Sequence, residues 1–365
     1  MPLTTTTAIP TPVDVVFQQT LLRNAKARCP YFEGTTPAMV SEHSGTFTAK
    51  WRRIENLTVP SSSLTELSGT ISFPTRSADQ PTVTDITATV SKFGNFIFLN
   101  EEVDLGNFNG QTDKLVEVLG INAGQALNRQ QRNVGEDNAT AVLTGAATTA
   151  TDISGGSTAS SNIKESDIAV AVNALNRQNA LTFRAMTTGS QNIGTSPIRE
   201  AYIGLTHVDT EEDIRTLTNF IPVEDYASQT EIFNGEFGTV GGVRFIASTE
   251  GSIDTGEGTA GTGSSTSHAR AATSGRTDLY NTLIYGMDAL GSLGFGFEHV
   301  RAIYKAGDTL PGVQLISHGR GSAGSADPLN ELSSMGWKSW HAGTVLNSNW
   351  VRNIRHSVDR LESNE

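Results

Sequence analysis

The sequence predicts an α+β protein in which an extended arm and a long hairpin precede a body with one long helix. Apolar and polar residues alternate over 46–56 and 83–99, as they do in half-buried strands. Apolar residues recur at helical spacing over 112–133. Helix-like and strand-like runs then alternate over 165–287, which predicts an α+β or α/β lobe.

The N-terminal segment is predicted to be an arm without a core of its own. Residues 1–10 look extended, and Thr11 followed by Pro12 is a typical helix start. Helical spacing of apolar residues continues until the Cys29-Pro30 pair stops it. We therefore expect this segment to pack on another part of the protein.

The hairpin is predicted from two strand-like runs joined by a polar, proline-containing span. The first run places Phe47 and Trp51 on one side, and the second run, 83–99, is interrupted at Gly94. A two-stranded ribbon is marginally stable alone in water, so a hairpin of this length indicates a partner surface. The candidate assembly residues are Phe47, Lys50, Trp51, Arg52, Arg53, Leu64, Leu67, Phe73, Arg76 and Lys92.

The central helix is predicted to run from its cap, Thr112, to Asn133, about 30 Å at 1.5 Å per residue. It could continue to Leu143, although Gly135 costs about 1 kcal/mol there and could bend or end it. The stretch 144–163 is rich in Gly, Ser, Thr and Ala and predicts a loop or linker.

The rest of the chain is predicted to contain shorter elements. Ser166 caps a helix, and another helix lies near Thr210–Leu217. A low-complexity loop covers 251–276. The predicted strands are Ala201–Thr206, Val243–Ser248, Leu279–Met287, Val313–Ser317, Trp337–Gly343 and Val351–His356.

Charge argues against a direct role in nucleic-acid binding. The chain has 26 Lys and Arg against 38 Asp and Glu, a net charge of −12, whereas such binding rests on cations that neutralise phosphates. A small basic cluster near the C-terminus is interpreted as a solvated or intersubunit face, because no aromatic stacking platform accompanies it. Its members are Arg352, Arg355, His356 and Arg360.

Targeting and redox signals are sparse. Cys29 is the only cysteine, so no intrachain disulfide can form. The first residues have neither the basic nor the apolar region of a signal peptide. No run of about 18 apolar residues predicts a membrane span.

Three sequence patterns resemble functional sites at first. Gly319, Gly321 and Gly324 match G-x-G-x-x-G, before a possible short helix at 327–334. A dinucleotide site needs an acidic residue about 20 positions on, and none lies between Glu331 and Asp359, so a glycine loop is favoured. The sequence therefore predicts no cofactor.

The acidic run 209–213 could hold a hard cation, but it is better interpreted as the first turn of a helix. His207 and Asp209 could form an acid–base pair, although a local turn or cap is favoured because no nucleophile motif accompanies them. The tryptophans 337, 340 and 350 are explained by packing. We predict no catalytic, cofactor or metal site.

Several long stretches resemble one family, the major capsid proteins typified by that of phage N-four. Their length, number and order carry the resemblance, which covers most of the chain. They are TTPAMVSEHSGTFTAKWRRIENL, TATVSKFGNFIFLNEEVDL, TDKLVEVLGINAGQALNRQQRN, LTNFIPVEDYA, GEFGTVGGVRFIAST, LPGVQLISHGRGSAGSADPLNELSSMGWKSWHAG and NWVRNIRH.

The resemblance implies the Hong Kong ninety-seven type capsid fold. We expect, in chain order, an N-terminal arm (1–45), an extended hairpin loop (46–100), a peripheral domain with the spine helix (101–164), an axial domain (165–300) and a return to the peripheral domain (301–365). The final strands would re-enter the peripheral sheet.

The resemblance also implies a function and partners. Hexamers and pentamers of the chain would form an icosahedral shell that encloses double-stranded DNA without sequence-specific binding. The implied partners are a portal, a separate scaffold and possible decoration proteins. The shell would belong to the virion and assemble in the cytoplasm of the bacterial host. Two alternatives stay open: another self-assembling virion protein, such as a decoration or tail-tube protein, and an acidic hydrolase.

Overall fold

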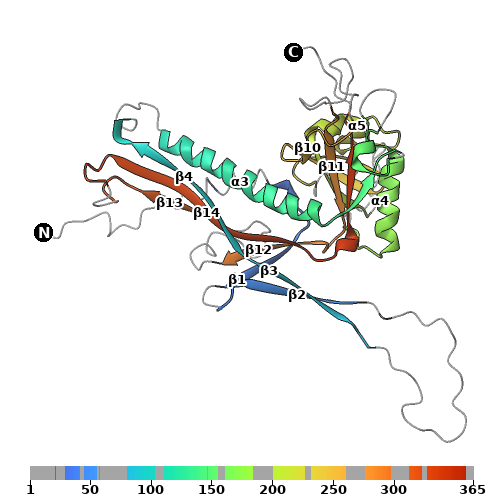
Figure 1. Cartoon of the computed structure of the whole chain (residues 1–365), viewed down its shortest axis with the longest axis horizontal. Helices are drawn as coiled ribbons and strands as arrows, with labels where there is room; N and C mark the ends of the chain where they lie inside the picture. Colours follow the sequence, from blue (N-terminus) through green and yellow to red (C-terminus); the bar gives the residue numbers. More distant parts are fainter. Residues whose placement is uncertain are drawn as a thin grey trace, which may run out of the picture.

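The computed structural model describes residues 21, 29–41, 45–55, 57, 80–102, 111–145, 147–154, 161–183, 200–226, 232–259, 276–296, 312–322 and 327–358. Within these residues the chain forms two large sheets, a long helix that runs from one sheet to the other, and a two-stranded hairpin that leaves the body (Figure 1).

The first sheet has five strands and is built around the longest one, β14 (Leu332–Val345). The strand order is β1 (Thr36–Ser41), β12 (Leu290–Gly296), β14 and β13 (Val313–His318), and β4 (Ser91–Asn100) also pairs with β14. β1 and β12 are parallel, and the other pairs are antiparallel.

The helix α3 (Gln111–Asp137) covers one face of this sheet (Figure 1). Its 27 residues span about 40 Å. Val116, Leu119 and Leu127 are buried on its inner face, where they join a cluster with Trp337 of β14 and with Leu21 of the N-terminal segment. Leu21 is the one described residue of the predicted arm helix, and it is buried in this cluster.

The end of α3 differs from the longest predicted helix. The helix passes through Gly135 and ends at Asp137, and residues Thr140–Leu143 form strand β5 instead. The Gly135 backbone lies so close to the second sheet that a Cβ there would be 2.8 Å from a methyl carbon of Leu283. The glycine therefore permits close packing and does not end the helix.

The second sheet has eight strands. Seven follow in the order β5, β15 (Val351–His356), β11 (Leu279–Tyr285), β6 (Tyr202–His207), β9 (Val243–Ser248), β8 (Glu236–Val240) and β7 (Ile221–Pro222), and β10 (Ile253–Asp254) pairs with β11. The expectation that the three final strands share the first sheet is wrong for β15, because its partners are β5 and β11.

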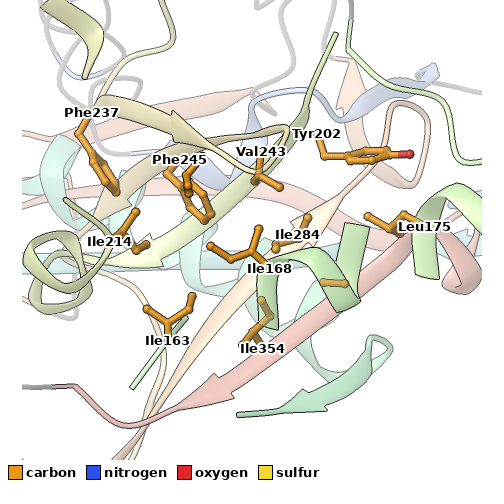
Figure 2. Close-up of a cluster of buried hydrophobic side chains, with 12 residues drawn as sticks. Ile163, Ile168, Leu175, Tyr202, Ile214, Phe237, Val243, Phe245, Ile284 and Ile354 are labelled. Atoms are coloured by element: carbon orange, nitrogen blue, oxygen red, sulfur yellow. The ribbon is translucent and has the colours of Figure 1, made fainter. Parts of the chain in front are cut away.

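One face of the second sheet is covered by α4 (Glu165–Arg177) and α5 (Glu211–Arg215). Figure 2 shows Ile168 and Leu175 of α4 directed towards Phe245, Ile284 and Ile354 of the sheet. The helix α4 begins one residue before the predicted cap, Ser166, because its first turn is closed by Asp167, whose carboxylate accepts from the Lys164 amide at 3.1 Å.

Short 3-10 turns connect the elements. They are η1 (Pro30–Phe32), η2 (Ala150–Asp152), η3 (Val208–Thr210), η4 (Val223–Asp225) and η6 (Ser348–Trp350). The short helix predicted at 327–334 does not form, because Asp327 closes a turn and β14 begins at Leu332.

The predicted hairpin is shorter than expected. Its strands are β2 (Thr48–Ile54) and β3 (Val83–Thr89), whose residues pair antiparallel throughout. The break falls at Val90 and not at Gly94, because β4 leaves the hairpin to pair with β14. Gly94 lies inside β4, where a Cβ would be 2.7 Å from the Trp337 carbonyl oxygen, so the glycine permits a close strand approach.

Candidate assembly surface

The base of the hairpin is anchored on the first sheet by apolar side chains. Ala49 and Trp51 of β2 point inwards with Ala88 of β3, and they pack with Val40 of β1 and Leu293 of β12. Alternation along each strand therefore places one face of the hairpin on the body and the other in solvent. Figure 1 shows the ribbon leaving the body beyond this anchor.

The outer face carries two cations that share one carboxylate. Lys50 Nζ and Arg52 Nε each lie 3.0 Å from an oxygen of Asp85 on the opposite strand. Hydrogen bonds from Arg52 and then from Lys50 lower the pKa of Asp85. Because these side chains are exposed, the ion pairs add little to stability. The group keeps one net positive charge, which is available to a partner.

Arg53, another candidate residue, is held within its own subunit. Its guanidinium lies 2.6 Å from Glu55 and donates to the Leu346 carbonyl at 3.0 Å. Glu55 also accepts from the Thr84 hydroxyl, and these two bonds, the one from Arg53 first, lower the pKa of Glu55. The sequence did not identify Glu55, which lies just after β2. Arg53 therefore fixes the direction of the hairpin.

Phe47 and Lys92 converge on one tryptophan. The ring of Phe47, which is 53% exposed, stacks on Trp340 with centroids 5.7 Å apart and 9° between the planes. Lys92 Nζ lies 5.9 Å from the centroid of the same indole. Phe295 packs beside both rings. The packing role predicted for Trp340 is confirmed, but its position under the hairpin base could not be read from spacing.

The far end of the described hairpin exposes apolar side chains that the sequence analysis did not single out. Ile54 and Val83 pair across the strands and are 67% and 47% exposed, and Leu57 is 55% exposed. Ile54 and Val83 lie two residues from Arg52 and Asp85, on the same outer face, and this spacing is the signal that could have found them. Four candidates, Leu64, Leu67, Phe73 and Arg76, lie outside the described residues.

The candidate acid–base pair is a local cap. His207 Nδ1 accepts from the Asp209 amide at 3.1 Å, and the Tyr280 hydroxyl donates to Asp209 at 2.8 Å. Glu211 is the first residue of α5, and its carboxylate pairs with Arg215 at 2.7 Å. The capping interpretation of His207 and the first-turn interpretation of the acidic run are both confirmed.

The remaining chemical candidates do not form a site. Gly319 and Gly321 lie in the turn after β13, and Gly324 is outside the described residues. Burial raises the pKa of the Cys29 thiol to about 12, which leaves it a poor nucleophile. Among the described residues, no three His, Cys, Asp or Glu side chains are placed to hold a metal ion, and no helix has the length and apolar character of a membrane span.

The predicted basic face near the C-terminus is wrong for its described members. Arg355 lies 2.6 Å from both Asp254 and Glu257, so its charge is neutralised within the subunit. His356 is fully buried, and burial lowers its pKa to about 4. Arg360 is outside the described residues. The reason is that β15 lies inside the second sheet, between β5 and β11, where Arg355 contacts Asp254 and Glu257 and His356 contacts Thr282.

A charged cluster joins α3 to the second sheet. Gln125 and Arg129 of α3 both donate to the Glu250 carboxylate, and Arg132 donates to the Glu250 carbonyl at 2.5 Å. One turn further on, Glu136 is buried, and desolvation raises its pKa to about 7 against the opposing effect of Arg132. This cluster determines how the helix meets the loop that follows β9.

Comparison with known proteins identifies the fold. No protein-family model matches the chain, and no curated protein matches it. The solved capsid of Ralstonia phage GP4 is similar with a TM-score of 0.53 and 10% identity, over 92% of this chain and 90% of that chain. A structure from Microbacterium phage Oxtober96 is similar with a TM-score of 0.51 and 8% identity, over 90% of both chains.

The head structure of Helicobacter pylori bacteriophage KHP40 has a TM-score of 0.50 and 10% identity, over 91% of both chains. These likenesses cover about nine tenths of each chain, so they concern the fold of nearly the whole chain and not of one part of it. The chain has the α+β fold of the Hong Kong ninety-seven type capsid proteins. The predicted fold class is confirmed.

Proposed function

We propose that this chain is the major capsid protein of a tailed bacteriophage, of the family typified by phage N-four. Hexamers and pentamers of the chain form an icosahedral shell that encloses double-stranded DNA. A portal, a separate scaffold and decoration proteins are the partners of such a shell, which assembles in the bacterial cytoplasm and remains in the virion. The domain boundaries expected from the sequence, from the arm at 1–45 to the peripheral return at 301–365, belong to the same proposal, except that β15 lies in the second sheet.

The observation that carries the proposal is the hairpin. It is fixed on the body by Trp51 and Arg53, yet its outer face exposes Ile54 and Val83, and Leu57 beyond β2 is exposed as well. A rigid ribbon that presents apolar side chains to solvent is stabilised when a neighbouring subunit covers them. The negative charge of the chain fits a container that does not bind its DNA.

The test replaces residues 58–79 by a tight turn and changes the exposed Ile54, Leu57 and Val83 to Ser. The bond between the Glu55 amide and the Thr82 carbonyl at the end of the described ladder is kept. We expect the full chain to form closed shells in electron micrographs. The shortened chain should sediment as small soluble species with an unchanged circular dichroism spectrum. Normal shells from the shortened chain would refute the assembly role of the hairpin.

A matched control deletes residues 260–275 of the low-complexity stretch predicted over 251–276, and it should still give shells. Tubes in place of shells would favour a tail-tube protein. A protein that stays monomeric and loses a hydrolytic activity on His207→Ala would favour the hydrolase. The capping role of His207 in the structure gives no support to that second alternative.

A further inference from the structure

The distal part of the first sheet has one face that α3 does not cover. There β14 lies between β13 and β4, and alternate residues of each strand point to opposite faces. Phe93, Ile97, Met335 and Trp337 point to the helix and belong to its core cluster. The intervening residues of the three strands therefore face the other way.

This second face is apolar and aromatic. Phe96 and Phe98 of β4 are each 63% exposed, although large aromatic side chains are normally buried. Leu332 of β14 is exposed beside Phe98, and Ile316 of β13 lies across Gly336 from Phe96. A contiguous exposed patch of this kind marks an interaction site.

The patch is hollowed into a groove with a volume of about 560 Å³. Gly336 and Gly94 form part of its lining, and a Cβ on Gly336 would lie 2.7 Å from the Cβ of Phe96. The glycines therefore keep the centre of the groove open. Among the described strands, β4 pairs only with β14, so the groove is also accessible along the outer edge of β4.

The charged side chains that line the groove have one sign. They are Lys92 and Lys338, and the described lining contains no Asp or Glu. This is unusual for a chain with 38 acidic and 26 basic residues. Complementary charge selects partners and suppresses wrong ones, so the groove suits a ligand that carries carboxylates.

The arrangement of the Phe96 and Phe98 rings favours a polypeptide ligand over a nucleic acid. Phe96 and Phe98 contact each other edge to face, with centroids 5.2 Å apart and 82° between the planes. Successive bases stack on exposed ring faces, and a pair of rings packed in this way does not offer two parallel platforms. Crossed rings beside an aliphatic wall instead suit branched apolar side chains.

We propose that this groove binds an extended, acidic and apolar segment of a protein other than this chain. Apolar side chains of the segment pack on Phe96, Phe98 and Ile316, and its carboxylates pair with Lys92 and Lys338. The inference does not depend on the proposed shell, because it concerns one face of one subunit.

The test titrates the full chain with a fluorescently labelled short peptide of the repeat Asp-Ser-Leu-Ser, which places Asp and Leu on one face when extended, and follows its anisotropy. We expect saturable binding that weakens as salt is raised. Phe96→Ala should weaken binding by about tenfold or more, as for a central aromatic contact. Lys338→Glu should weaken it by a similar factor at low salt and less at high salt.

Two controls change comparable side chains on the solvent-exposed surface of α3, away from the groove. Val118→Ala deletes an exposed apolar side chain on α3, and Lys114→Glu reverses an exposed charge on the same helix. Neither should change peptide affinity. Circular dichroism and shell formation, measured on every variant, separate loss of the groove from loss of the fold or of assembly.

Three results would overturn the proposal. The first is equal binding of a Lys–Leu peptide of the same length. The second is tighter binding of a peptide that copies residues 58–79, which would make the groove a contact between copies of this chain. The third is preferential binding of a single-stranded oligonucleotide, which would make it a nucleic-acid platform.

Discussion

Protonation of Glu136 should control the stability of the junction between α3 and the second sheet. Its side chain is 11% exposed, one carboxylate oxygen is buried without a hydrogen-bond partner, and the nearest guanidinium, of Arg132, is 3.7 Å away. Desolvation raises its pKa from 4.5 to about 7, Asp254 and Asp137 act in the same direction, and Ser252 and Arg132 oppose them.

The magnitude follows from these two pKa values. A tenfold difference in proton affinity is worth about 1.4 kcal/mol, so ionised Glu136 lowers the free energy of unfolding by roughly 3 kcal/mol. Because the folded state holds the proton more tightly, this loss is absent below pH 4.5, develops as the pH rises to about 7, and is constant above that.

The perturbation is Glu136→Gln, which resembles the protonated carboxyl. We expect the variant to be more stable than the parent by roughly 3 kcal/mol at about pH 8 and nearly equal at about pH 4.5. Urea unfolding of the unassembled chain, followed by circular dichroism at both pH values, measures the difference. The exposed Glu117→Gln on the same helix is the control and should show no such pH dependence.

Two buried histidines give the free energy of unfolding the opposite pH dependence. Burial lowers the pKa of His341 and of His356 to about 4, so their contribution to stability is lost as the pH falls from 6.5 towards 4. Both are present in parent and variant, so their effect cancels in the comparison. A Glu136→Gln variant that is destabilised, or that shows the same difference at both pH values, would refute the reasoning.

Two further stability predictions follow from close contacts. Arg244→Met leaves the fully buried carboxylate of Glu236 without its cation and should cost about 3–5 kcal/mol in urea unfolding; a loss below about 1 kcal/mol would show that the pair is dispensable. Gly94→Ala forces a Cβ against the Trp337 carbonyl oxygen and should cost about 1–3 kcal/mol in the same assay. The control Gly319→Ala, whose Cβ would meet nothing within 4 Å, should be neutral. Equal stability of the two variants would contradict the close approach of Gly94 to Trp337.

Elements with a strong pattern of their own were predictable. The strands β9 and β15 have the predicted bounds, Val243–Ser248 and Val351–His356. The apolar side chains of a buried strand form a run that is visible in the sequence. These two strands could therefore be predicted without knowing which strands they pair with. The predicted start of α3 was also close, because the apolar stripe on its inner face marks the residues that meet a sheet.

Elements that depend on distant segments were not predictable. Gly94 looked like an interruption, but the space it leaves is needed by Trp337, which lies far along the chain. Local spacing allows the helix to continue through Thr140–Leu143, but these residues pair with β15 as a strand. The anchoring contacts of Phe47 and Arg53 likewise involve residues near the C-terminus.

By itself, the sequence determined the α+β class, the hairpin strands, the long helix, the acidic balance and the lack of a catalytic motif. These properties lie in composition and in the spacing of neighbouring residues. Only the tertiary structure decided which strand pairs with which, where the hairpin ends, and which face of the first sheet stays open. The reason is that backbone hydrogen bonds are nearly the same for every residue, so partner and register are set by side chains that meet only after folding.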